Sequence, residues 1–283
     1  MKILLTGGTG FVGRHLLREL LQRGNHVACV VRPNSAKIIL PDSAVHLIET
    51  DDLFSESVGW WERQLQDIEL VVHAAWFVEP GEYLQSPKNL SCLQGTLTLA
   101  RACIASRTRK FVSIGTCFEY DLADGALSVE TPLNPKTLYA ASKASTFLLL
   151  TEIAKVYDLE FLWCRLFYLF GEGEDERKLV RSIRKSLSEG TLVSLGSGKH
   201  IRDFIDVTAA ADKIVDAALS STVGPINICS GVPQTVKEIA INIATEYGRV
   251  DLLRFGSRED NTFDPPMVVG IDPYAASKSD SFD

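Results

Sequence analysis

The sequence predicts an α/β fold of the Rossmann type, with a doubly wound parallel sheet, helices on both faces and a smaller C-terminal lobe. Three observations lead to this fold class. Strand and helix patterns alternate along the first part of the chain, a glycine-rich turn joins the first strand to the first helix, and the alternation changes after Gly171. Regular alternation is typical of parallel sheets, because each parallel connection needs a crossover, usually a helix.

The glycine-rich turn follows directly on the first strand. Lys2–Thr6 is a short apolar run typical of a buried strand, and it leads into three glycines spaced G-x-x-G-x-x-G. Apolar residues at helical spacing follow and end at Gly24. This order forms a dinucleotide fingerprint, because the turn lets the backbone approach a pyrophosphate and the helix N-terminus offers free N–H groups. The expected cofactor contacts from this turn are Gly7, Gly10, Phe11, Val12 and Gly13.

The second strand, expected at Val27–Val31, bears on which cofactor is bound. In NAD-specific proteins an acid at its end binds the ribose hydroxyls, but here Arg32 follows. A cation at this place suits the 2′-phosphate of NADP, so we predict NADP(H), with NAD(H) as the alternative. A third strand is expected at Val45–Ile48. Beyond it, the candidates for an adenine contact are Asp52 and Leu53, although Asp52 also fits a plain surface acid.

The remaining elements continue the alternation. Before Gly171 the patterns predict strands at Leu70–Ala75, Phe111–Ile114 and Phe161–Phe167, and helices at Leu90–Ile104 and Tyr139–Tyr157. After an acidic loop at 172–176 they predict helices at Leu179–Leu187, Thr208–Leu219 and Val236–Tyr247, and short strands at Thr191–Leu195, Asp203–Val207 and Pro225–Ile228. We expect an NAD(P)-binding domain at 1–168, to which 203–228 return, and a substrate-binding lobe at 169–202 and 229–283. The polar end, from Ala275 to Asp283, is expected to be mobile.

Composition excludes several classes of protein. A chain of 283 residues that is 46% hydrophobic can bury a sizeable core. With a net charge of −7 and without a basic cluster, it is not expected to bind nucleic acid. We see no apolar run near the ~20 residues of a membrane span, and no signal peptide. Six scattered cysteines without a CxxC pair predict reduced thiols in a cytoplasmic protein, and the five histidines lack metal-ligand spacing.

A tyrosine and a lysine share one face of the helix predicted at Tyr139–Tyr157. Tyr139 and Lys143 are four residues apart, and the apolar run after them anchors the helix. A free phenol has a pKa of about 10, and a nearby ammonium group lowers it by favouring the phenolate. We expect Lys143 to act on Tyr139 in this way and to hold a cofactor ribose. Thr116, just past the strand Phe111–Ile114, is placed to orient a substrate oxygen. The alternative is a packed ring and a solvated amine.

The same spacing recurs at Tyr274 and Lys278. This second copy follows Pro273, lies in the polar tail and has no apolar continuation that could hold a helix in place. We therefore expect no site there. The repeat also indicates that Tyr-x-x-x-Lys is informative only in combination with the glycine turn.

Together and in this order, the motifs resemble those of extended short-chain dehydrogenases/reductases, in the branch that acts on nucleotide sugars. The resemblance covers nearly the whole chain. The matching segments are Thr6–Gly13, His73-Ala74-Ala75, Gly115–Tyr120, Tyr139 with Lys143, Arg165 with Phe170-Gly171, Arg202–Val207 and Asn227–Gly231. The resemblance implies a catalytic set of Thr116, Tyr139 and Lys143, with Ala74, Ala75, Tyr139 and Lys143 beside the cofactor.

The resemblance also implies contacts to a nucleotide diphosphate. Arg202 matches the arginine that binds it, and a planar guanidinium suits this role because it can grip phosphate oxygens with two parallel bonds. The alternative is that Arg202 pairs with Asp203 or Asp206. Arg165 would add a contact. Arg258 would add another, because its segment is similar to one in hexose 4-ketoreductases. The helix that usually follows that segment has no counterpart, so either a shortened lobe or a truncated chain is expected.

One departure from the family pattern concerns dehydration. Dehydratases of this branch follow the catalytic Thr with Asp-Glu, the acid and base that remove water, whereas Cys117 and Phe118 stand here. Glu119 comes one position late, and a continuing strand would turn it to the other face. Dehydration is therefore disfavoured.

A second departure lies in the helix at Leu90–Ile104. The family often has an Asn three residues before a Gly-Thr pair, but Cys92 stands at that position. Asn89 lies one helical turn earlier and cannot simply substitute for it. The sequence does not indicate which residue takes over the packing or proton-relay role of the family's asparagine.

The resemblance and Arg32 together imply an NADPH-dependent reductase of a nucleotide-linked 4-keto-6-deoxy sugar. An epimerase that holds NAD throughout its cycle is the alternative. An NADP-binding regulatory protein fits less well, because such proteins commonly lose the catalytic Tyr. Reduction of a small non-nucleotide ketone would leave Arg202 without a role. The family also implies a possible homodimer, formed through the helices at Leu90–Ile104 and Tyr139–Tyr157.

Overall fold

The computed structural model of the protein describes residues 1–38, 44–260 and 265–271, which form two compact units. The first contains Met1–Glu119, Pro135–Arg165 and Thr208–Ile226, and the second contains the rest. The division expected from the sequence placed 120–134 and 203–207 with the first part, whereas the structure groups both segments with the second. The second Tyr-x-x-x-Lys copy, at Tyr274 and Lys278, lies outside the described residues.

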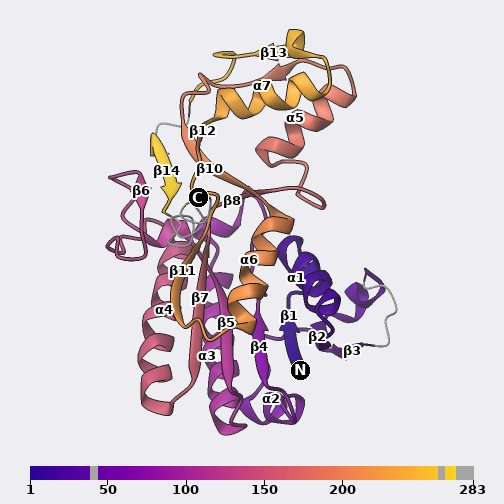
Figure 1. The fold of residues 1–283 in the computed structure, drawn as a ribbon, viewed down its shortest axis with the longest axis vertical. Coiled ribbons are helices and arrows are strands. Elements are labelled where there is room, and N and C mark those ends of the chain that lie inside the picture. Colours follow the sequence, from indigo (N-terminus) through magenta and orange to yellow (C-terminus); the bar gives the residue numbers. More distant parts are fainter. Residues whose placement is uncertain (39–43, 261–264, 272–283) are drawn as a thin grey trace, which may run out of the picture. The chain divides into compact units, whose positions relative to one another are not determined.

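A seven-stranded parallel sheet forms the centre of the first unit (Figure 1). Leu4 pairs with Ala28 on one side and with Val71 on the other, in parallel register. The strand order reverses between the first strand and the fourth, and open α/β sheets bind their ligands at the carboxyl ends around such a switch point. The predicted fold class is confirmed. In spatial order the strands are β3 (Val45–Glu49), β2 (His26–Val31), β1 (Lys2–Thr6), β4 (Leu70–His73), β5 (Lys110–Thr116), β7 (Glu160–Leu166) and β11 (Gly224–Ile228).

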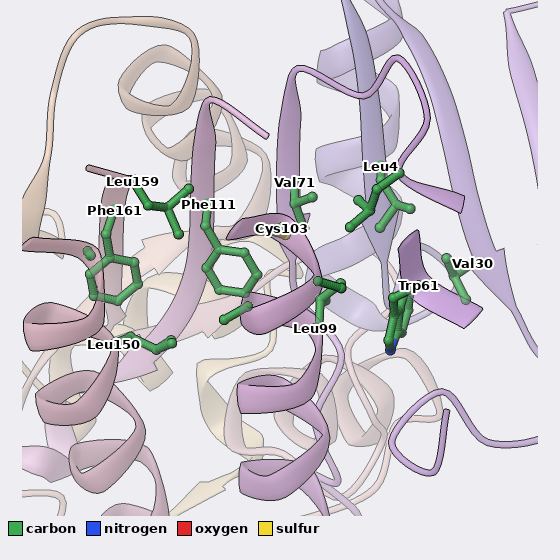
Figure 2. Close-up of a cluster of buried hydrophobic side chains, with 14 of the residues drawn as sticks. Leu4, Val30, Trp61, Val71, Leu99, Cys103, Phe111, Leu150, Leu159 and Phe161 are labelled. Atoms are coloured by element: carbon green, nitrogen blue, oxygen red, sulfur yellow. The ribbon is translucent and has the colours of Figure 1, made fainter. Parts of the chain in front are cut away.

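Helices cover both faces of this sheet. Figure 2 shows Leu4, Val71 and Phe111 in the cluster packed on one face, with Leu99 and Cys103. Ile3 and Leu5 alternate with Leu4 along the same strand and are also fully buried, so the opposite face is covered too. The helices are α1 (Phe11–Gln22), α2 (Val58–Gln64), α3 (Lys88–Ala105), α4 (Leu138–Tyr157) and α6 (Val207–Leu219).

The second unit has its own core, between α5 (Leu179–Ser188) and α7 (Val236–Glu246). Ile183 and Ile243 are both buried there. A capping box between Thr235 and Glu238 starts α7. Several strands of this unit have only two to four residues, too few for a periodic signal in the sequence. They are β6 (Ala126–Leu127), β8 (Tyr168–Phe170), β9 (Val193–Ser194), β12 (Pro233–Thr235), β13 (Leu253–Arg254) and β14 (Met267–Gly270). The longer strand β10 spans Ile201–Asp206.

The described residues offer neither a membrane-spanning helix nor a metal site. In that part of the chain, no helix is both long enough and apolar enough to cross a bilayer. No group of three His, Cys, Asp or Glu side chains is arranged to hold a metal ion within the same residues.

Candidate active site

The glycine turn forms a cradle at the start of α1. Gly7 has a φ of +75°, and a Cβ there would lie 2.7 Å from the backbone N of Ala75. A Cβ on Gly13 would lie 1.9 Å from the carbonyl oxygen of Gly7, so both positions require glycine for packing. Gly10 instead is exposed and stands at the N-cap of α1, where no side chain caps the helix. The first N–H groups of α1 are therefore available to an anionic group.

A chain of neutral hydrogen bonds supports this cradle. Thr96 donates its hydroxyl to the carbonyl of Cys92 (2.7 Å), so it accepts from Nε2 of His73 (2.9 Å). The other ring nitrogen, Nδ1, then accepts from the hydroxyl of Thr6 (2.8 Å), which accepts in turn from the backbone N–H of Ala75 (3.3 Å). Burial lowers the pKa of His73 to about 3, with the charge of Lys143 as a smaller cause. A neutral His73 therefore fixes the two alanines after β4 beside the glycine turn.

The residues predicted for the adenosine end lie just beyond strands β2 and β3 of the same sheet. Arg32 follows β2 directly and is exposed. Asp52 is exposed in a turn, where its Oδ1 accepts from the backbone N–H of Phe54 (3.0 Å), and Leu53 packs against the core. Arg14 was not found from the sequence, yet its Nε donates to the carbonyl of Gly10 (3.2 Å). Its only sequence signal is a position one helical turn after the N-cap glycine.

The structure brings the three predicted catalytic residues together. Tyr139 and Lys143 lie on α4 with 9% and 3% of their surfaces exposed. Nζ of Lys143 donates to the carbonyl of Ile114 (2.6 Å) and lies 3.7 Å from the ring centroid of Trp76. Thr116 acts on Tyr139 as well, since its side chain contributes a lowering effect on the pKa of that phenol. Thr116 is the last residue of β5, not a residue just past a shorter strand.

The expectation that Lys143 lowers the pKa of Tyr139 is wrong. Burial raises the pKa of Tyr139 far above its usual value, and Tyr83 and the negative charge of Glu119 raise it further. Burial lowers the pKa of Lys143 to about 7, against the effect of Glu119. The physical reason is desolvation, which penalises the charged form of each group. Tyr139 therefore keeps its proton, which suits a proton donor.

Glu119 occupies a buried position directly behind Thr116. It accepts from the backbone N–H of Thr116 (2.8 Å), from Nε1 of Trp163 (3.0 Å) and from Nε of Arg165 (2.7 Å). The expectation that a strand would turn Glu119 to the other face is wrong, because Cys117–Glu119 forms a 3₁₀ turn. Gly115 is needed here, since a Cβ would lie 2.6 Å from Oε1 of Glu119.

This ion pair changes the interpretation of two residues. The side chains of Glu119 and Arg165 are 0% and 1% exposed. Glu119 is committed to Arg165 and is not available as a dehydration base, although for a different reason than the sequence indicated. Arg165, predicted to contact a diphosphate, points into the unit, where its guanidinium lies 4.4 Å from the ring centroid of Phe147. We therefore leave Arg165 out of the candidate substrate contacts.

Arg202 and Arg258 belong to the second unit. Nη1 of Arg202 donates to the carbonyl of Ile201 (2.9 Å), and its guanidinium lies 5.3 Å from the ring centroid of Tyr168. The carboxylate of Asp203, a candidate partner for Arg202, accepts from the backbone N–H groups of Ser230 (2.7 Å), Gly231 (2.9 Å) and Gly270 (3.2 Å).

Arg258 is exposed and lines a hollow of about 200 Å³ in the second unit. Leu179, Leu195 and Val236 supply apolar lining, and His200 adds a polar group. Glu259 and Asp260 also line the hollow, so its charged groups are of both signs.

Comparisons with known proteins identify the family of the chain. The model of the NAD dependent epimerase/dehydratase family matches residues 3–229. The chain therefore belongs to this family, and it is an oxidoreductase-type enzyme of the extended short-chain dehydrogenase/reductase class.

The individual relatives have low sequence identity to the chain but align with most of its length. A dTDP-6-deoxy-L-talose 4-dehydrogenase (NAD(+)) from Aggregatibacter actinomycetemcomitans is 24% identical over 251 residues, which cover 87% of this chain and 91% of that protein. A UDP-N-acetylglucosamine 4-epimerase from Methanobrevibacter ruminantium, solved with UDP-N-acetylmuramic acid, superposes with a TM-score of 0.87 at 22% identity, covering 100% and 92%. MoeE5, solved with UDP-glucuronic acid and NAD, gives 0.82 at 25% identity, covering 98% and 92%.

Proposed function

We propose that the protein is an NADPH-dependent reductase of a nucleotide-linked 4-keto-6-deoxy sugar. The observation that carries the proposal is the catalytic group of Thr116, Tyr139 and Lys143, in which Tyr139 is held in its protonated form. A buried, protonated phenol is the acid that ketone reduction requires. Because Glu119 is committed to Arg165, elimination of water is not supported.

In the proposed mechanism NADPH supplies the hydride when bound. Thr116 donates its hydroxyl to the C4 carbonyl oxygen and so fixes the oxygen beside Tyr139. Tyr139 donates its proton to that oxygen as negative charge develops there. Lys143 holds the cofactor ribose with its ammonium group. The burial of Tyr139 keeps competing water from the proton being transferred.

The cradle fits a dinucleotide. The uncapped start of α1 and the close packing at Gly7 and Gly13 give a pyrophosphate direct access to backbone N–H groups. Arg32 supports the choice of NADP(H), because it is exposed where an NAD-specific protein carries an acid. The proposed cofactor contacts are Gly7, Gly10, Phe11, Val12, Gly13, Arg32, Asp52, Leu53, Ala74, Ala75, Tyr139 and Lys143.

For the substrate we propose a nucleotide-diphosphate sugar, bound through Arg202 and Arg258. The hollow beside Arg258 offers apolar contacts from Leu179, Leu195 and Val236 to a nucleotide base. The similarity to a dehydrogenase named for C4 of a dTDP-linked 6-deoxy sugar supports this substrate class, because oxidation at C4 is the reverse of ketone reduction.

A nucleotide-sugar 4-epimerase with tightly bound NAD is the second candidate. It is favoured by the similarity to a 4-epimerase. It is also favoured by the cofactor of two similar proteins, because the talose dehydrogenase is an NAD(+) enzyme and MoeE5 was solved with NAD. Calorimetric titration with NADPH and NADH, after a check for bound cofactor, separates the two. We expect empty protein that prefers NADPH and loses this preference in Arg32→Ala. Arg63→Ala, which removes an exposed arginine of α2, is the matched control. Protein that carries NAD, or prefers NADH, would support the epimerase.

Two further proposals concern the setting of the enzyme. A homodimer through α3 and α4 is supported by exposed apolar side chains on α4, where Leu148 is 55% and Val156 73% exposed. Sedimentation of the wild-type protein and of Leu148→Asp tests it, and a monomeric wild type would contradict it.

A cytoplasmic location is supported by six buried cysteines that form no disulfide among the described residues.

A further inference from the structure

One polar stripe of α3 holds the segment that follows β4. Asn89, Cys92 and Thr96 share a helix face, because they are spaced i, i+3, i+7. Thr96 binds His73 at the end of β4, and Sγ of Cys92 accepts from the backbone N–H of Phe77 (3.4 Å). The stripe thus fixes the course of the chain past the catalytic residues.

Asn89 makes the most specific of these contacts. It is fully buried, and its Oδ1 accepts from Nε1 of Trp76 (2.8 Å). Its Nδ2 donates to the carbonyls of Tyr83 (2.6 Å) and Ser86 (2.9 Å), so the amide has one possible orientation. The indole of Trp76 is therefore oriented by a side chain whose own rotation is fixed on both sides.

The face of the indole lies against the catalytic lysine. The ring centroid of Trp76 is 3.7 Å from Nζ of Lys143. The ring of Tyr139 packs edge-on against the indole, with 6.5 Å between the two ring centroids. An ammonium group has three N–H donors. The carbonyl of Ile114 takes one, and the ring faces of Trp76 and, more distantly, Trp163 (5.9 Å) attract the ammonium group.

We propose that Trp76, oriented by Asn89, is a positioning residue that holds Lys143 in the place from which it binds the cofactor ribose. This inference rests on the proposed function, in which Lys143 holds the cofactor. The buried asparagine one turn before Cys92 does act on the catalytic lysine, but it does so through the indole ring.

Binding calorimetry tests the proposal without a turnover assay. The ligands are NADPH and adenosine 2′,5′-bisphosphate, which lacks the nicotinamide ribose; if the protein prefers NADH, NADH and ADP replace them. We expect Trp76→Leu to weaken NADPH binding about tenfold, since cation–π contacts have this order of strength, and to leave the adenosine fragment unchanged. Trp76→Phe keeps an aromatic face and should stay within about threefold of wild type. Trp60→Leu, a tryptophan of α2 packed on the core, is the matched control and should change neither affinity.

A double-mutant cycle with Lys143→Met distinguishes the possible failures. If Trp76 acts through Lys143, Trp76→Leu should add no further loss of NADPH affinity in a Lys143→Met background. Lys143→Met that weakens binding while Trp76→Leu does not would overturn the inference and leave the proposed function standing. Lys143→Met that binds NADPH like wild type would contradict both. Equal weakening of NADPH and the adenosine fragment in Trp76→Leu would reveal a general structural effect and also overturn the inference.

Discussion

Two networks of buried polar side chains lie near the carboxyl edge of the same sheet, and they are built in opposite ways. The network of Thr6, His73 and Thr96 consists of neutral groups, each donating to the next. The network around Glu119 and Arg165 instead contains an ion pair with almost no exposure. A neutral chain is cheap to desolvate and suits a support that only has to stay in place.

The charged network acts on protonation. The negative charge of Glu119 raises the pKa of both Tyr139 and Lys143, so it favours the protonated form of each. Burial acts in the same direction on Tyr139 and in the opposite direction on Lys143. This difference indicates that the neutral network holds the cofactor cradle in place, whereas the charged network favours the protonated form of Tyr139.

The largest effect is expected from removing the proton donor itself. Tyr139→Phe keeps the ring and its edge-on contact with Tyr83 but cannot donate a proton. Turnover of a nucleotide-linked 4-keto sugar should fall by about 10²- to 10⁴-fold, a much larger loss than any accompanying change in NADPH affinity. Stopped-flow absorbance of NADPH measures the rate, and calorimetry measures the affinity. A variant that retains full turnover would rule out this role of Tyr139.

Breaking the charged network should cost stability. Glu119→Gln leaves Arg165 buried without its counter-charge, and we expect the free energy of unfolding to fall by about 3–5 kcal/mol in urea titrations. The exposed pair of Arg109 and Glu160 offers a matched control in the same unit, with a bond of 3.0 Å and side chains 43% and 39% exposed. Glu160→Gln should lower the free energy of unfolding by less than about 1 kcal/mol. Similar losses of unfolding free energy in both variants would contradict a larger contribution of the buried pair to stability.

The neutral network should respond to acid. His73 has a pKa of about 3 when folded and about 6.5 when unfolded, so the unfolded state binds more protons at intermediate pH. Its contribution is therefore complete above about pH 6.5 and declines as the pH falls toward 3, by up to about 1.4 kcal/mol for each pH unit. His73→Asn should lose this slope in urea titrations between pH 4 and 8. His46→Asn, at an exposed histidine, should keep it, and an unchanged slope in His73→Asn would refute the assignment.

The sequence allowed the local features of the site to be predicted, because they depend on residues close together in the chain. The glycine turn and the pair of Tyr139 and Lys143 each lie within one strand–helix junction or one helix face. The pKa of Tyr139 could not be predicted in this way, since it depends on how deeply the ring is buried.

The missed residues reach the site through tertiary contacts. Trp76 and Glu119 act on Lys143 or Thr116 from other elements, and Glu119 does so through a 3₁₀ turn of three residues. No periodic pattern signals a turn that short. Arg165 matched the family motif, yet its buried pairing with Glu119 becomes visible only when β5 and β7 are placed side by side.

The central claim is most directly tested by following the cofactor during turnover. Purified protein is mixed with NADPH and a dTDP-linked 4-keto-6-deoxy sugar, and both NADPH loss and sugar product are quantified. The account predicts one NADPH oxidised for each sugar reduced at C4. Protein that arrives with NAD bound and interconverts nucleotide sugars without net consumption of cofactor would contradict it.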